Sequence, residues 1–230
     1  MPGLFVTGTS TEVGKTYVTS LIARQLVGEG LRVGVYKPVA SGCVIGEDDQ
    51  LVSEDATSLW EAAGRPLTLE AVCPQRFKAP LAPNRAAACE QKTVDSRRLR
   101  EGVAPWLDGF DFVLVEGAGG LLSPLSDEDY NADLAIDLHA SHRWPLLVVA
   151  ANTLGTINAT LQTIITANAY RSGVPVAGVV LSQVDERPDP SAASNHLDIA
   201  RSSPAPLLAD VRWQGGFDQP VDWLKVAKTG

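Results

Sequence analysis

Short runs of apolar and β-branched residues recur along the chain, and helix-length stretches separate them. Runs this uniformly apolar are typical of strands that are buried on both faces, since a half-exposed strand would alternate apolar and polar positions. The pattern predicts strands at residues 4–7, 32–37, 110–116, 145–151, 176–182 and 206–211. We therefore expect an α/β fold of three layers, in which a mostly parallel, doubly wound sheet lies between helices.

The intervening stretches predict helices, and several of them begin at Asp, Asn, Ser or Thr, which cap helix N-termini. The predicted helices span residues 15–28, 50–63, 95–107, 131–142, 157–172 and 192–201. Residues 72–92 contain three prolines and no clear period, so we predict an ordered excursion on the surface. No internal repeat or long linker interrupts this order, and we expect one domain over residues 1–230.

The composition narrows the possible partners. A length of 230 residues with 45% hydrophobic content is enough to bury a large core. The formal net charge of −8 disfavours broad attraction to nucleic acid or to an anionic membrane, and no run of 18 apolar residues predicts a membrane span. The three cysteines are far apart and predict neither a disulfide framework nor a zinc site. We expect a cytoplasmic protein with small-molecule partners.

The first predicted strand is followed by GTSTEVGKT, residues 8–16, and then by a predicted helix. Ligands of parallel sheets bind beyond the carboxyl ends of the strands. In a glycine-bounded loop at this place, backbone N–H groups can bind phosphate, Lys15 would neutralise its charge and the Thr16 hydroxyl would ligate Mg²⁺. The loop has five residues between its glycines, whereas the common pattern has four. The alternative is an ordinary strand-to-helix turn with a solvated lysine.

Charged residues also end the next two predicted strands. Lys37, in KPVASG, could stabilise the charge that develops during phosphoryl transfer, with Ser41 close enough to bind a substrate; alone, it could be a lysine before a proline turn. Glu116, in EGAGG, ends a buried strand, where a carboxylate needs hydrogen bonds or a metal. A Mg²⁺ ion beside Thr16 would be a natural partner. The alternative is a glycine-rich turn with an incidental glutamate.

Three further segments carry candidate roles, and the first two of them allow two interpretations each. Asp55 is either an acid in the first turn of a helix or a further metal ligand. Residues 155–158 open a predicted helix and either form an ordinary cap or bind a substrate carboxylate through free N–H groups. Ser182 and Gln183 end the fifth predicted strand, where a nucleotide base could lie.

Taken together, these motifs resemble those of the dethiobiotin synthetases. GTSTEVGKT, YKPVASG, VEGAGG, LGTIN and PAPLL occur in the order of that family over residues 6–211. The resemblance implies a P-loop NTPase-like fold and an enzyme of biotin biosynthesis. It would convert 7,8-diaminononanoate, CO₂ and ATP, with Mg²⁺, into dethiobiotin, ADP and phosphate through a carbamate and a carbamic-phosphoric anhydride. It further implies a homodimer with active sites at the interface.

The resemblance also implies roles for individual residues. Catalytic roles are implied for Thr11, Lys15 and Lys37, and Mg²⁺ ligation for Thr16, Asp55 and Glu116. Substrate binding is implied for Ser41 and, in the partner subunit, for Gly155, Thr156 and Asn158. The implied nucleotide-binding residues are Glu12, Val13, Gly14, Lys15, Thr16, Tyr17, Asp55, Glu116, Gly117, Ala118, Gly119, Ser182 and Gln183.

Two departures and one alternative remain. Ser182 stands where many members of that family carry an Asn that contacts adenine, so other nucleoside triphosphates could serve, and the tail after Val211 keeps little of the family's pattern. The alternative is a deviant P-loop ATPase that acts as a partitioning or positioning switch. Such proteins carry an extra lysine in or just before the loop and often a membrane-binding helix. Residues 9–13 contain no lysine, and residues 219–230 are too short and mixed for an anchor.

Overall fold

The computed structural model describes residues 1–46 and 49–229. Six strands form a parallel sheet in the order β2-β5-β1-β6-β7-β8. Their bounds are β1 (Gly3–Gly8), β2 (Val33–Tyr36), β5 (Phe112–Gly120), β6 (Leu146–Ala151), β7 (Val176–Ser182) and β8 (Leu207–Val211). From β1 the chain adds β2 and then β5 on one side, and it adds β6, β7 and β8 on the other side of β1. This placement of strands on both sides of the first one is that of a doubly wound sheet. The predicted α/β fold is confirmed.

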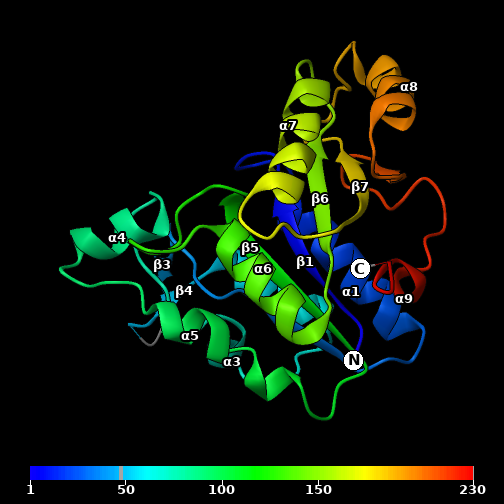
Figure 1. The fold of residues 1–230 in the computed structure, drawn as a ribbon. Helices are drawn as coiled ribbons and strands as arrows, with labels where there is room; N and C mark the ends of the chain where they lie inside the picture. The colour runs from blue at the N-terminus through cyan, green and yellow to red at the C-terminus, as the bar shows by residue number, and fades with distance from the viewer. Residues whose placement is uncertain (47–48, 230) are drawn as a thin grey trace.

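Helices cover both faces of this sheet. The helices are α1 (Lys15–Gly28), α2 (Glu54–Ala62), α3 (Leu69–Val72), α4 (Pro83–Cys89), α5 (Ser96–Glu101), the 3₁₀ helix η1 (Ala104–Trp106), α6 (Asn131–His142), α7 (Thr156–Ala169), α8 (Ala192–Ser202) and α9 (Trp223–Val226). Helices α6 and α7 lie along the face turned to the viewer, and α1 packs against the other with α2 beside it (Figure 1). Within the described ranges, no helix is long and apolar enough to cross a membrane.

The central strands explain the uniformly apolar runs of the sequence. Every residue of β1 is buried, as are residues 112–117 of β5 and 146–150 of β6. Because helices cover both faces, side chains that point either way along these strands leave water, and each position favours an apolar residue. The Trp144 indole closes the amino edge of the sheet, where its N–H donates to the Met1 carbonyl oxygen at 3.0 Å.

The segment 72–92 differs from its prediction as a surface excursion. Val72 and Cys73 are fully buried, and residues 83–89 form α4. The segment pairs with the loop that follows β2, since Ala40 donates to the Gln75 carbonyl at 2.9 Å and accepts from the Phe77 N–H at 2.9 Å. The segment is ordered, as predicted, but it contains a helix and part of it packs into the core, so its prediction as a surface excursion was only partly right.

Several boundaries also differ. The helix predicted from residue 50 begins at Glu54, because Leu51–Val52 form β4, which pairs with β3 (Val44–Ile45), and the Ser53 hydroxyl accepts from Ala56 N–H as the helix cap. Strand β5 continues through the glycines to Gly120. The helix predicted over 95–107 is divided into α5 and η1.

Candidate active site

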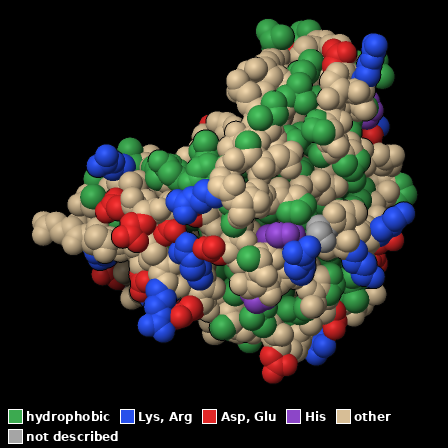
Figure 2. Space-filling view, viewed as in Figure 1, with side chains coloured by type: hydrophobic (Ala, Val, Ile, Leu, Met, Phe, Trp, Pro, Cys, Tyr) green, Lys and Arg blue, Asp and Glu red, His purple; other side chains and the backbone are tan. Residues whose placement is uncertain are grey.

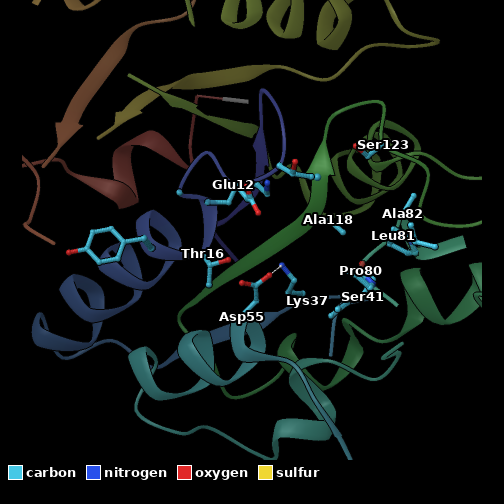
Figure 3. Close-up of a pocket in the computed structure, with 18 residues that line it drawn as sticks. Glu12, Thr16, Lys37, Ser41, Asp55, Pro80, Leu81, Ala82, Ala118 and Ser123 are labelled. Atoms are coloured by element: carbon cyan, nitrogen blue, oxygen red, sulfur yellow. Dashed lines mark ion pairs between the residues drawn. The ribbon is translucent and has the colours of Figure 1, made fainter. Parts of the chain in front are cut away.

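A cavity of about 640 Å³ lies at the carboxyl ends of β1, β2 and β5. Segments far apart in sequence line it, including loop 11–17, loop 40–42, the start of α2 and residues 80–83 (Figure 3). The strand ends predicted to carry the chemistry are therefore brought together at one edge of the sheet. The remaining part of the wall comes from residues 118–123.

The loop after β1 has the backbone of an anion site. Glu12 and Gly14 have left-handed backbone, with φ of 57° and 87°. A Cβ on Gly14 would overlap the Ser182 hydroxyl, so only glycine fits there. The backbone N–H groups of residues 10–14 have no hydrogen-bond partner among the described residues. Lys15 Nζ donates to the Ser10 carbonyl oxygen at 2.9 Å, and this hydrogen bond joins the two ends of the loop. These free N–H groups and the start of α1 can bind a phosphate.

A cluster of charges lies beside this loop, in which Lys37 and Glu116 are buried and the Asp55 side chain is 51% exposed. Lys37 Nζ is 2.6 Å from Glu116 Oε1 and 2.7 Å from Asp55 Oδ2, and the Thr16 hydroxyl donates to Glu116 Oε1 at 2.8 Å. The Lys37 side chain is 3% exposed and that of Glu116 is 0% exposed. The Glu116 Oε2 atom is buried without a hydrogen-bond partner. A carboxylate oxygen in this state is free to accept a cation or a donor from a ligand.

The two lysines differ in how firmly they hold their charge. Burial lowers the pKa of Lys15 to about 8, with a further contribution from the Lys37 charge, although the Glu116 carboxylate opposes both. Burial also disfavours the charged form of Lys37, but Glu116 and Asp55 together raise its pKa well above the usual value. Burial would raise the pKa of Asp55, and Lys37 overcomes this and lowers it. Lys37 therefore stays charged throughout the physiological range.

The oxygen atoms at this point fit a hard divalent cation. The Asp55 and Glu116 carboxylates meet at the Lys37 ammonium, and the Thr16 hydroxyl is hydrogen-bonded to Glu116; Mg²⁺ prefers such oxygen ligands together with phosphate and water. In residues 1–46 and 49–229, no group of three His, Cys, Asp or Glu side chains could hold a metal alone. A Mg²⁺ ion here would need the hydroxyl and the nucleotide's phosphates as well.

On the side away from α1, the cavity carries small polar and apolar groups. Ser41 and, near the start of α1, Thr11 line it, and their predicted contacts with a substrate stay a prediction. Residues 80–83 and Ser123 line it too, and the sequence analysis did not identify them. Residues 80–83 have no signal of their own, since they reach the site only because segment 72–92 pairs with the loop after β2. Ser123 follows EGAGG by three residues, and this closeness to a strand end that was expected at the site could have identified it from the sequence.

Several nucleotide candidates lie next to the cavity instead of lining it. Val13 is buried behind the loop, and Gly117 packs against the Asn131 amide. Ser182 is buried beside Gly14, whereas the Gln183 side chain donates to the carbonyls of residues 185 and 186. Tyr17 lines the cavity, and its hydroxyl donates to the carbonyl of residue 215 at 2.7 Å.

The start of α7 is not brought to this cavity within one chain. Gly155, Thr156 and Asn158 line neither it nor a second cavity of about 370 Å³ beside it. Thr11 and Ser123 line both cavities, and residues 159–166 of α7 line the far side of the second.

Solved structures with this fold include two FtsY proteins, a signal recognition particle receptor and a cell division protein. FtsY of Elizabethkingia anophelis superposes with a TM-score of 0.52 at 14% identity and covers 98% of this chain, which spans 64% of that one. FtsY of Thermotoga maritima superposes with a TM-score of 0.52 at 17% identity, over 99% of this chain and 68% of that one. At such identities the likeness supports the P-loop α/β fold alone.

Sequence comparison goes further. A family model described as an AAA domain matches residues 2–221. The ATP-dependent dethiobiotin synthetase BioD of Rhodopirellula baltica is 48% identical over 218 residues, which are 92% of this chain and 84% of that protein. The protein of the same name from Anaeromyxobacter dehalogenans is 42% identical over 214 residues, or 93% of this chain and 91% of that protein. The resemblance of the motifs is thus confirmed, and the chain belongs to the family of ATP-dependent dethiobiotin synthetases, which are ligases of biotin biosynthesis.

Proposed function

We propose that this chain closes the ureido ring of dethiobiotin from 7,8-diaminononanoate, CO₂ and MgATP, releasing ADP and phosphate. The observation that carries the proposal is the meeting of two buried lysines, Lys15 and Lys37, at one phosphate-binding cavity. A plain ATPase needs a lysine in its loop but does not need a second one at the end of β2, two strands away in the sheet. A reaction that joins two anions does need it.

The reaction takes three steps. One amine of the substrate attacks CO₂, forms an N–C bond and loses a proton, which leaves a carbamate. A carbamate oxygen then attacks the γ-phosphorus of ATP, the bond to the β,γ-bridging oxygen breaks, and ADP leaves. Finally the second amine attacks the carbonyl carbon of the mixed anhydride, loses a proton and expels phosphate as the ring closes.

The second step brings the carbamate and the γ-phosphate together, and the lysines lower the repulsion between them. Lys15 would contact the phosphates and Lys37 the carbamate; in support of these roles, both lysines and Ser41 line the same cavity. Because Glu116 and Asp55 keep Lys37 protonated, its charge is present before the substrates arrive. Such preorganised charge needs no rearrangement as the transition state forms. A Mg²⁺ ion held by Thr16, Asp55 and Glu116 would neutralise phosphate charge.

The diamine end of the substrate would contact Thr11 and Ser41, and its distal carboxylate would bind at the start of α7 in a partner subunit. Two observations support a homodimer of this kind. The Thr156 hydroxyl at that helix start is buried and unpartnered. Apolar side chains are exposed around α7, including Leu154 at 84% and Ile165 at 63%, and Figure 2 shows hydrophobic side chains over this part of the surface.

Subunit mixing tests the shared site. Asn158→Asp places a carboxylate in the first turn of α7, where the helix tolerates it but a substrate carboxylate would be repelled. Lys37→Ala and Asn158→Asp should each be impaired. An equimolar mixture of the two should regain about a quarter of the wild-type activity, since about half of its dimers are hybrids and one of the two sites in each hybrid is intact. Activity of the mixture equal to the average of the two variants would contradict a shared site.

Ser182 and Gln183 would lie near the nucleotide base.

We also propose that residues 1–230 act as one cytoplasmic domain. In support of one domain, the hydroxyl of Tyr17 in α1 donates a hydrogen bond to the carbonyl of residue 215, near the carboxyl end of the chain.

The direct test is to incubate the protein with 7,8-diaminononanoate, bicarbonate and MgATP and to measure dethiobiotin by mass spectrometry. We expect dethiobiotin and phosphate in equal amounts, both dependent on the diamine. Phosphate release without the diamine and without product would overturn the proposal and favour a switch ATPase.

A further inference from the structure

Asn131, the first residue of α6, is fully buried and uses its whole side chain. Its Oδ1 accepts from the Ala118 N–H at 3.0 Å. Its Nδ2 donates to the carbonyl oxygens of Ala118 at 2.7 Å, Gly120 at 2.9 Å and Ser123 at 3.2 Å. Its backbone N–H also donates to the Ser123 carbonyl, at 3.2 Å. One side chain thus holds both ends of the segment 118–123.

The sheet does not hold this segment by itself. Val6 of β1 pairs with Glu116 and Gly8 pairs with Gly120, so one residue of β1 stands opposite three of β5. Strand β2 ends opposite Val115 and gives no pairing on the other side. Backbone groups of buried segments need partners, and a bulge of this kind leaves them without a ladder. The Asn131 amide supplies the missing hydrogen bonds.

The glycines of this segment follow from the same arrangement. A Cβ on Gly117 would overlap Asn131 Oδ1. Gly119 has a φ of 79°, and a Cβ there would lie 2.5 Å from Ser123 Oγ. That hydroxyl in turn accepts from the Gly120 N–H at 2.9 Å. The segment is therefore rigid because side chains fill the space that the glycines leave.

Segment 118–123 forms the wall between the two cavities. Ala118 and Gly119 line the first cavity, Gly120 lines the second, and Ser123 lines both. In Figure 3, Ala118 and Ser123 lie on the side of the site that faces residues 80–82. A substrate that extends from Lys37 past Thr11 toward the second cavity would run along this wall.

We propose that Asn131 is a positioning residue, which acts through the segment 118–123 to hold the wall of the diamine site. The inference rests on the proposed function for the identity of the substrate. The Asn131 side chain would affect turnover without contacting a reactant, through the hydrogen bonds of its amide group to this segment.

The test compares two substitutions with a matched control. Asn131→Asp keeps the size and loses the side-chain donors, and Asn131→Leu removes every hydrogen bond of the side chain while the backbone bond to Ser123 stays. Both should lower kcat/KM for the diamine by about 10- to 100-fold, the effect of displacing a substrate contact by about 1 Å. Ala118 and Gly119 are among the implied nucleotide contacts, but most of those contacts lie in loop 8–16 and the start of α1, which keep their own hydrogen bonds, so the Kd for ATP should change less than kcat/KM. Trp144→Phe removes a buried hydrogen bond at the opposite edge of the sheet and should leave kcat/KM unchanged.

The pH profile gives a readout that loss of stability alone would not produce. In Asn131→Asp, the introduced carboxylate would face three carbonyl oxygens and would take up a proton readily. The defect of this variant should therefore shrink between about pH 8 and about pH 6, relative to wild type, whereas that of Asn131→Leu should not. Equal losses of ATP affinity and diamine turnover, or a loss no greater than in Trp144→Phe, would overturn the inference.

Amide hydrogen exchange separates this inference from the proposed function. In Asn131→Leu, the N–H groups of Ala118 and Gly120 should exchange at least about tenfold faster, while those of β6 keep the wild-type rate. Unchanged exchange would refute the role of Asn131 whatever the substrate is. If wild type forms no dethiobiotin while exchange still rises at these two positions, the proposed substrate is wrong and the positioning of the wall stands.

Discussion

Removing the Lys37 ammonium should separate catalysis from nucleotide binding. The side chain is 3% exposed and makes its two ion pairs with Glu116 and Asp55, not with the phosphate loop. Loop 8–16 closes through the bond between Lys15 and the Ser10 carbonyl, which Lys37 does not touch. In Lys37→Ala we therefore expect ATP to bind nearly as in wild type, while most turnover is lost.

The magnitude follows from the geometry. Loss of one preorganised group aimed at developing charge costs about 10²- to 10³-fold in kcat, or about 2.7–4 kcal/mol in the transition state. Lys37→Ala also leaves the fully buried Glu116 carboxylate with the Thr16 hydroxyl as its remaining bonded partner. Breaking a buried pair on one side costs about 3–5 kcal/mol of stability. Mg²⁺ should restore part of that loss, because it would balance the same carboxylate.

The assay measures dethiobiotin formation by mass, ATP affinity by calorimetry and thermal unfolding with and without Mg²⁺. Lys92→Ala serves as the control, since this lysine also pairs with a glutamate, Glu90, but is 60% exposed. It should match wild type in all three measurements. If ATP affinity in Lys37→Ala falls by the same factor as kcat, Lys37 is a general phosphate or structural residue and the reasoning is refuted.

Three further predictions concern residues that are implied in nucleotide binding. Because burial lowers the folded pKa of Lys15 from 10.5 to about 8, the folded chain binds fewer protons than the unfolded one between these values. Stability should therefore rise with pH through that window, while calorimetric ATP affinity falls as the ammonium is lost; an affinity independent of pH would contradict this. Tyr17→Phe removes the hydrogen bond to the Gly215 carbonyl and should lower the free energy of unfolding by about 1 kcal/mol in a denaturant titration; an unchanged unfolding midpoint would contradict this. If base selectivity depends on the side chain at position 182, then Ser182 lacks the amide that would contact adenine, and rates with ATP, CTP and GTP should be similar. A strict preference for ATP would show that other residues set the selectivity.

The sequence predicted the sheet and the residues at its strand ends with good accuracy. Strand-length apolar runs occur only where both faces are covered, so β1, β5, β6 and β7 could be identified without knowledge of their neighbours. Since parallel strands expose their carboxyl ends at one edge, the meeting of Thr16, Lys37 and Glu116 followed from the order of elements alone.

Other contributions to the site could not be predicted, because they depend on contacts between distant segments. Residues 80–83 reach the cavity because Ala40 pairs with the segment around Gln75, and nothing in the local pattern of residues 72–92 indicates that pairing. Asn131 could be identified as the start of a helix, but its role depends on a bulge in β5 opposite β1, which is a property of strand register.

For this protein, local sequence determined which residues carry charge, which glycines bound the phosphate loop and which runs enter the core, because these depend on side-chain chemistry and on the preference of apolar groups to leave water. The tertiary structure alone decided that Glu116 keeps one oxygen unpaired, that Lys37 is held between two carboxylates, and that an amide from α6 supports the wall of the site. These contacts depend on ångström-scale distances between residues that are 13 to 79 positions apart in the chain, and such distances follow from packing rather than from composition.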